Sequence, residues 1–260
     1  MFGSAEIGRV IGKAQAGPLR DQLRQALIEA QLELKESDFS VLVVFGGVDG
    51  AGKGEAIHAL NEWMDPRGIL TLAFDDEPPA TVAEHPPYWR YWRYLPAHGQ
   101  TAFVLKGWHH MPFLDAVYER IGSSTFDRQI DRMNAFEKLL VDDGTLILKF
   151  WLHLGREQQE ARFHALEQDP LNSWRVTDLD WRHLRMYDRF IDVGSHLIDR
   201  TSTHEASWTI VEGSDANYRN LMVGSILLQA LKARLDGRSF EIQRDACAHA
   251  APEWLDGGAG

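Results

Sequence analysis

A lysine and an aspartate lie in a glycine-rich stretch with the spacing of a loop that binds phosphate. Gly47 and Gly52-Lys53 match the G-x-x-x-x-G-K pattern of a P-loop, which follows a strand and opens a helix. Backbone N–H groups in such a loop point into one concavity, and the lysine reaches the outer phosphates. A tight strand-to-helix turn would explain the glycines but not Lys53 in register. The candidate phosphate-binding residues are Gly47, Gly50, Ala51, Gly52, Lys53 and Gly54.

Metal ligands are less evident around this loop. Gly54 stands where a hydroxyl residue usually ligates Mg²⁺. The acidic run 75–77 follows an expected strand, at the edge where open α/β sheets place ligands, although a solvated acidic loop is the alternative. The strand expected at 101–105 ends without the aspartate that P-loop enzymes use for Mg²⁺. His109 and His110 follow it, but adjacent side chains of an extended chain point to opposite faces.

Arginines in the second half of the chain form a candidate cationic clamp over phosphates. Three of them share one face of a helix expected at 178–200, and two more precede it in the chain. Aspartates three or four positions away favour the alternative of an exposed, salt-bridged face, and the sequence leaves both open. The arginines are Arg182, Arg185, Arg189, Arg162 and Arg175. The aromatic segment 86–94 with its interleaved arginines could stack on a base, but we expect most of its rings to pack in the core and the arginines to point toward phosphate.

Composition limits the classes of partner and compartment. The net charge of −11 argues against nonspecific binding to nucleic acid or acidic membranes, and any polyanionic substrate would require a local basic patch. No apolar run approaches the roughly 20 residues that span a bilayer. A single cysteine, Cys247, excludes a disulfide framework. We therefore expect a cytoplasmic protein.

The 260 residues alternate between apolar strand-like runs and helical patterns. This alternation predicts a three-layer α/β/α fold with a five-stranded parallel sheet. An arm is expected at 1–18, one domain at 19–235, and a tail or interdomain linker at 236–260. The expected strands are 41–45, 69–74, 101–105, 145–152 and 207–212, and the expected helices are 19–34, 53–64, 126–141, 155–168, 178–200 and 216–235.

From about residue 19 to 235 the order of motifs resembles the polyphosphate kinase 2 family. The family's G-x-D-x-x-G-K-G matches 47–54, including the glycine after the lysine. The arrangement is most similar to the N-terminal half of the two-domain polyphosphate:AMP phosphotransferases. The other matching motifs are Asp65-Pro66-Arg67-Gly68, Arg90-Tyr91 ahead of Leu95-Pro96, Trp108, Phe136-Glu137, Asp169-Pro170 and Trp174-Arg175 leading into Asp180.

The resemblance implies a P-loop kinase-like fold with a helical lid at about 155–177, and a reaction between inorganic polyphosphate and AMP or ADP with Mg²⁺. Asp49 would position Mg²⁺ and the nucleotide, and Lys53 would bind phosphate. The resemblance also implies a homo-oligomer or pairing with a second polyphosphate kinase-like domain. Contacts to phosphate or nucleotide are implied for Arg67 and Arg90, and a grip on polyphosphate for Arg162 and Arg175.

The sequence also departs from the family pattern. Leu105 replaces the strand-ending aspartate, Lys106 and Met111 replace two arginines, and Leu166 replaces a lid arginine. Losing one electrostatic contact to a transition state typically costs about 2.7–4 kcal/mol of barrier. Three functions therefore stay open: an active phosphotransferase, a degenerate copy that binds phosphate or assembles with an active copy, and a nucleoside monophosphate kinase.

Overall fold

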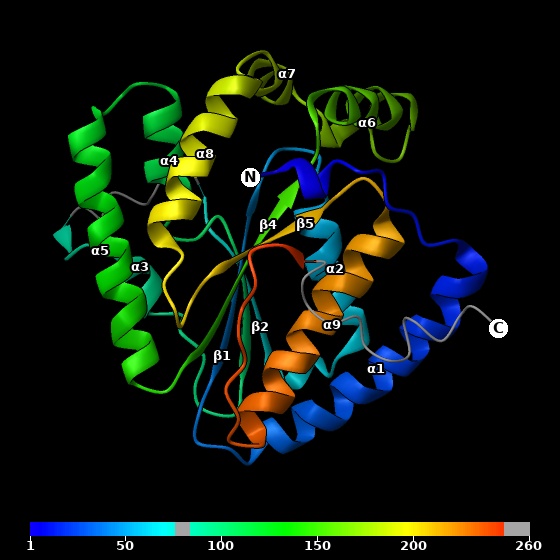
Figure 1. Ribbon diagram of the computed structural model, residues 1–260, viewed down its shortest axis with the longest axis vertical. Coiled ribbons are helices and arrows are strands. Elements are labelled where there is room, and N and C mark those ends of the chain that lie inside the picture. Colours follow the sequence, from blue (N-terminus) through cyan, green and yellow to red (C-terminus); the bar gives the residue numbers. More distant parts are fainter. Residues whose placement is uncertain (76–83, 247–260) are drawn as a thin grey trace.

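The computed structural model describes residues 1–75 and 84–246 (Figure 1). A single sheet runs through the described chain, in the order β2-β3-β1-β4-β5, and all its neighbouring strands pair in parallel. The predicted five-stranded parallel sheet is therefore confirmed. Its strands are β1 (Val41–Gly47), β2 (Ile69–Ala73), β3 (Thr101–Leu105), β4 (Leu146–His153) and β5 (Trp208–Glu212).

Helices cover both faces of this sheet. One layer holds α1, α2 and α9, and the other holds α4, α5 and α8, while α6 and α7 lie beyond the carboxyl ends of the strands (Figure 1). The helices are α1 (Lys13–Lys35), α2 (Lys53–Trp63), α3 (Trp89–Trp92), α4 (His110–Val117), α5 (Ser123–Asp142), α6 (Arg156–Gln168), α7 (Asp178–Arg185), α8 (Tyr187–Thr201) and α9 (Ala216–Leu235). Short 3₁₀ turns lie at η1 (Gly3–Ala5), η2 (Pro66–Gly68) and η4 (Ser173–Arg175).

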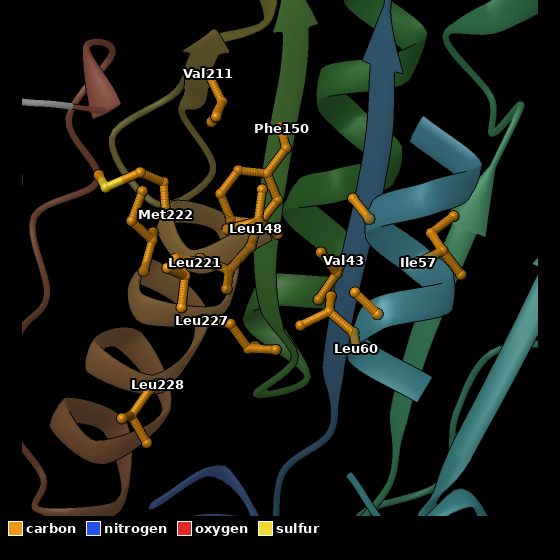
Figure 2. Packing of buried hydrophobic residues seen from close by; sticks show 14 of the residues in the cluster. Val43, Ile57, Leu60, Leu148, Phe150, Val211, Leu221, Met222, Leu227 and Leu228 are labelled. Carbon is orange, nitrogen blue, oxygen red and sulfur yellow. The ribbon is translucent and has the colours of Figure 1, made fainter. Parts of the chain in front are cut away.

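Alternate residues of the central strands enter two separate cores. Val43 of β1 packs with the α2 and α9 side chains, whereas its neighbour Val44 packs on the side of α4, α5 and α8. Figure 2 shows the first core, in which Leu148 and Phe150 of β4 lie between α9 and Val43. Burial on both faces explains the nearly continuous apolar runs from which the strands were predicted.

A buried ion pair joins α5 to β4 within the second layer. Lys149 Nζ donates to Glu137 Oε2 at 2.6 Å and to the Thr201 carbonyl at 2.7 Å, and Trp108 Nε1 donates to Glu137 Oε1 at 3.0 Å. Burial would raise the pKa of Glu137, but the charge of Lys149 and the neighbouring His109 lower it to about 2. Glu137 is therefore a structural anion of the core rather than a surface carboxylate.

Several elements differ from their predicted bounds. Helix α1 begins at Lys13, six residues before the expected Leu19, so part of the expected arm is helical. The helix expected at 178–200 is two helices, because the Met186 N–H bonds the His183 carbonyl in a tight turn. Helix α4 was not predicted. Its Pro112 stands in the first turn, where the missing N–H leaves no helical hydrogen bond unmade.

Both expected extensions pack on the sheet within the described residues. Near the N-terminus, Phe2 is buried and stacks on His153 at the end of β4, with ring centroids 4.4 Å apart. After α9 the chain returns along β5, where the Ile210 N–H donates to the Arg244 carbonyl at 2.7 Å and Ala246 is buried. The rest of the expected tail, 247–260, lies outside the described residues.

Candidate functional site

The glycine-rich loop connects β1 to α2 at the carboxyl edge of the sheet, and two of its glycines are required by close contacts. Gly47 has φ +123°, and a Cβ there would lie 2.0 Å from the Leu152 carbonyl oxygen of β4. Gly52 has φ +88°, and a Cβ there would lie 2.1 Å from Arg219 Nη1. A side chain at position 47 would therefore collide with the backbone of β4 and one at position 52 with the Arg219 guanidinium, and both positions have the left-handed φ that favours glycine.

Lys53 directs its ammonium back into this loop. Its Nζ donates to the carbonyls of Gly47 at 2.9 Å and Val48 at 2.8 Å, and lies 4.0 Å from Asp49 Oδ1. Burial lowers the pKa of Lys53, and the charge of Asp49 opposes that effect. The ammonium is thus held within the loop by two neutral carbonyls and one nearby carboxylate.

Asp49 is oriented by a histidine from a distant helix. His183 of α7 is buried, and its Nδ1 lies within hydrogen-bond distance of Asp49 Oδ2, at 2.6 Å. The other ring nitrogen, Nε2, lies 2.5 Å from the Tyr118 hydroxyl after α4. Burial would raise the pKa of Asp49, but the hydrogen bond from His183 and the charge of Lys53 hold it below its usual value. Asp49 is therefore a fixed carboxylate at neutral pH.

Glu55, in the first turn of α2, gathers three arginines from other parts of the chain. Its Oε1 accepts from Arg162 Nη2 of α6 at 2.6 Å and lies 2.8 Å from Arg175 Nη1. Its Oε2 accepts from Arg219 Nη2 of α9 at 2.8 Å. Burial would raise the pKa of Glu55, but Arg219 and Arg162 lower it. The two arginines expected to grip polyphosphate are thus beside the loop, on an internal carboxylate.

A cavity of about 220 Å³ opens between the loop and the α4 and α8 layer. Lys53, Asp49, Arg175 and His183 supply charged or polar groups to its lining, while large apolar side chains form its deeper wall. Asp49 is the one carboxylate among the described residues that line it. The apolar wall includes Leu105, Phe113, Leu114, Trp151, Phe163, Leu166, Phe190, Leu197 and Trp208.

The carboxyl end of β3 places Leu105 beside the loop. Leu105 pairs in register with Phe45 of β1 and lines the cavity, as does Lys106, which adopts a left-handed φ of 56°. The position at which the family pattern has its aspartate is therefore part of the site, but its side chain is apolar. Leu166, which replaces a lid arginine, lines the same cavity.

Two predicted contact residues, Arg67 and Arg90, are not among those that line the cavity at the loop. Arg67 lies in η2, just before β2, and therefore at the amino edge of the sheet, whereas the loop lies at the carboxyl edge. It is exposed and pairs with Asp65 at 2.5 Å. Arg90 lies beside the end of β2, an edge strand, where it donates to the Asp75 carbonyl at 3.1 Å.

The clamp of arginines on the helix after the lid does not form. Arg182 lies over the Tyr118 ring, with its guanidinium carbon 5.0 Å from the ring centroid, and Arg189 donates to the Ala116 carbonyl at 3.1 Å. Arg185 is exposed. The break at Met186 separates the two helices that carry them, so no common face results.

Metal ligands do not cluster in the part of the chain that the structure describes. No group of three or more His, Cys, Asp or Glu side chains has the arrangement of a metal site there. His109 is buried with its Nε2 2.8 Å from Glu137 Oε1, so it belongs to the core ion group. Asp75 is exposed, and Asp76 and Glu77 lie outside the described residues. Within 1–75 and 84–246, no helix is long and apolar enough to cross a bilayer.

Sequence reasoning missed the residues that support the loop from a distance. His183 lies in a helix for which the sequence indicated a role only for the arginines. Glu55 and Arg219 belong to no motif that the sequence analysis identified. The sequence held one signal, which is Glu55 two residues after Lys53. A carboxylate at that position lies close to any anion that the loop binds. Their roles depend on tertiary contacts between α2, α7 and α9, which the local pattern does not encode.

This chain is similar to known proteins over most of its length. The family model described as Polyphosphate kinase 2 matches residues 13–238. A curated polyphosphate:AMP phosphotransferase from Pseudomonas aeruginosa is 42% identical over 253 residues, which cover 97% of this chain and 50% of that protein. The chain thus spans about half the length of this curated relative.

Solved structures show the same similarity. A Pseudomonas aeruginosa crystal structure assigned to polyphosphate kinase 2 superposes with a TM-score of 0.81 at 41% identity, covering 90% of this chain and 48% of that one. The crystal structure of polyphosphate kinase 2 from Arthrobacter aurescens superposes with a TM-score of 0.82 at 26% identity, covering 91% and 86%. On the extent of the family match and the identity to its relatives, this chain belongs to the polyphosphate kinase 2 family.

Proposed function

We propose that this chain is a phosphotransferase domain that moves phosphate between inorganic polyphosphate and a nucleotide, with AMP as the preferred acceptor. The observation that carries the proposal is the P-loop itself, with Lys53 folded onto the loop and Asp49 fixed by His183 at the mouth of a cavity. A relative named polyphosphate:AMP phosphotransferase supports polyphosphate and AMP as the substrates.

In this proposal the loop binds the phosphate that is transferred. Backbone N–H groups around Gly50 and Gly52 donate hydrogen bonds to its oxygens, and Lys53 donates to those oxygens in place of the carbonyls of Gly47 and Val48. Arg162 and Arg175, which lie beside the loop, offset the negative charge of the rest of the polyphosphate. Catalysis here is positioning and electrostatic stabilisation, because phosphoryl transfer needs little covalent chemistry from the protein.

The residues at the loop fit a divalent cation held largely by water and phosphate. Mg²⁺ is usually bound through one or two carboxylates together with substrate phosphates. Asp49 supplies one carboxylate to the cavity, and its low pKa keeps that group charged. We propose Asp49 as the residue that holds Mg²⁺, which when bound offsets the charge that builds on the phosphates.

A second candidate function is a weakened copy that binds phosphate and assembles with an active copy. Leu105 favours it, because an apolar side chain lines the cavity where a second carboxylate would hold the metal. Lys106 keeps a positive charge at the next position, but without the bidentate geometry of an arginine.

A coupled assay for ADP and ATP formed from polyphosphate, AMP and Mg²⁺ separates the two functions. We expect measurable turnover in the wild-type chain and a rise of at least tenfold in Leu105→Asp. No turnover in either protein, with tripolyphosphate binding that Lys53→Ala abolishes, would establish the binding copy instead. Turnover with ATP and a nucleoside monophosphate but not with polyphosphate would contradict the proposed substrate class.

A further inference from the structure

We propose that Glu55 is an internal anion which occupies a three-arginine site beside the phosphate loop, and that an oxyanion of inorganic polyphosphate displaces it from the two arginines of the lid segment. The lid segment is defined here as residues 156–175, which hold α6 and η4. We call the contacts of Glu55 with Arg162 and Arg175 the latch, because they hold the lid segment to α2. The identity of the ligand rests on the proposed function, whereas the latch rests on these contacts alone.

Both carboxylate oxygens of Glu55 are paired with arginines. Oε1 lies 2.6 Å from Arg162 Nη2 and 2.8 Å from Arg175 Nη1, and Oε2 lies 2.8 Å from Arg219 Nη2. Arg162 and Arg175 belong to the lid segment, whereas Arg219 is buried in α9. The carboxylate thus ties the lid segment to the helix that begins at Lys53.

The charges around Glu55 do not balance. Three guanidinium groups surround one carboxylate, so the cluster keeps a formal charge of +2 in a chain whose net charge is −11. Arg175 also lines the cavity at the loop, together with Lys53. A polyanion whose first phosphate occupies the loop therefore finds excess positive charge nearby, and its main local competitor for Arg162 and Arg175 is Glu55.

A structural role for Glu55 as the counterion of Arg219 does not account for this arrangement. Arg219 also donates to the Gly213 carbonyl at 3.2 Å and to Asn220 Oδ1 at 3.1 Å, and it packs against Gly52. A glutamine at position 55 would still offer one oxygen to Arg219. What the negative charge adds is the attraction for the two lid arginines.

Two measurements test the proposal. The first is calorimetric titration of tripolyphosphate into the wild-type chain, Glu55→Gln and the control Glu62→Gln, which changes an exposed carboxylate on the same helix. We expect Glu55→Gln to bind at least tenfold more tightly than the other two proteins, and Lys53→Ala to abolish binding in each background. Equal or weaker binding by a folded Glu55→Gln would overturn the displacement of Glu55 by the ligand.

The second measurement needs no ligand. Amide hydrogen exchange within 156–175 should be faster in Glu55→Gln and in Arg162→Gln than in the wild-type chain. The matched controls are Glu62→Gln and Arg156→Gln, because Arg156 is an α6 arginine paired with exposed Asp188 at 2.6 Å. If Glu55→Gln does not fold, Arg162→Gln decides this arm, since it breaks a lid contact and leaves the Arg219 pair intact.

Together, the titration and the exchange measurement test the latch and the proposed function independently. Exchange that is unchanged in both variants overturns the latch, whatever the affinities are. Exchange that is faster, with no tripolyphosphate binding by any of the proteins, supports the latch and overturns both the ligand and the proposed function.

Discussion

His183 Nδ1 lies 2.6 Å from Asp49 Oδ2, although the two residues are 134 positions apart in the chain. The contact joins α7, which follows the lid segment, to the phosphate loop. It fixes the orientation of the carboxylate that we propose for the metal, and it contributes to the low pKa of that carboxylate.

Replacing this histidine should change the titration of Asp49. We expect His183→Ala to raise the pKa of Asp49, because a hydrogen bond that favours the charged form is removed while burial remains. The pKa is measured from the carboxyl ¹³C shift during an acid titration. His196→Ala, which removes an exposed histidine paired with Asp127, is the control and should leave the pKa of Asp49 unchanged. An unaltered Asp49 titration in His183→Ala would refute the positioning role.

Two glycines of the loop region should respond in opposite directions to alanine. Gly47→Ala places a Cβ 2.0 Å from the Leu152 carbonyl oxygen at φ +123°, so the free energy of unfolding should fall by at least ~2 kcal/mol. Gly54→Ala meets no atom within 4 Å and lies inside α2, so the free energy of unfolding should rise by about 0.5 kcal/mol. Urea unfolding of both variants gives the comparison. A Gly47→Ala protein as stable as Gly54→Ala would contradict the close approach of position 47 to the Leu152 carbonyl oxygen.

The buried pair of Glu137 and Lys149 should be costly to break from one side. Glu137→Gln leaves Lys149 charged and buried, and we expect the free energy of unfolding to fall by about 3–5 kcal/mol. The double variant Glu137→Leu with Lys149→Met should recover most of that loss, because both desolvated charges disappear together. Lys138→Gln removes an exposed pair and should change stability little. Single and double variants of equal stability would contradict this account.

Acid should remove the contribution of the charged Glu137 carboxylate to the free energy of unfolding. Its pKa falls from 4.5 to about 2 on folding, so the charged carboxylate contributes its full stability above about pH 4.5. That contribution declines as the pH falls from 4.5 toward 2, because Glu137 is protonated in the unfolded chain over this interval while it stays charged in the folded one. The difference in unfolding free energy between the wild-type chain and Glu137→Gln should therefore narrow over this interval. A difference that stays constant from pH 6 to pH 3 would contradict the lowered pKa.

The sheet and the loop could be predicted from the sequence, because local residue patterns specify both. Apolar runs buried on two faces predicted the parallel strands, and the glycine spacing with Lys53 predicted a loop that the structure forms between β1 and α2. The position of Leu105 at the site also followed from the sequence, since parallel strands end at one edge of a sheet.

Contacts between distant elements were not accessible in the same way. The spacing of Arg182 and Arg189 suggested a clamp, but the chain turns at Met186, and the two side chains contact Tyr118 and the Ala116 carbonyl instead. Arg67 was assigned to phosphate by a motif, yet its place before β2 puts it at the opposite edge of the sheet. Glu55 was not singled out, because its importance arises only when α6, η4 and α9 converge on it.

The central claim is that the loop and Lys53 bind an oxyanion of phosphorus, and calorimetric titration of tripolyphosphate tests it most directly. Lys53→Ala should abolish binding that the wild-type chain shows, while Lys138→Ala, which removes an exposed lysine on α5, should bind as the wild-type chain does. Equal affinities in Lys53→Ala and the wild-type chain would contradict the account.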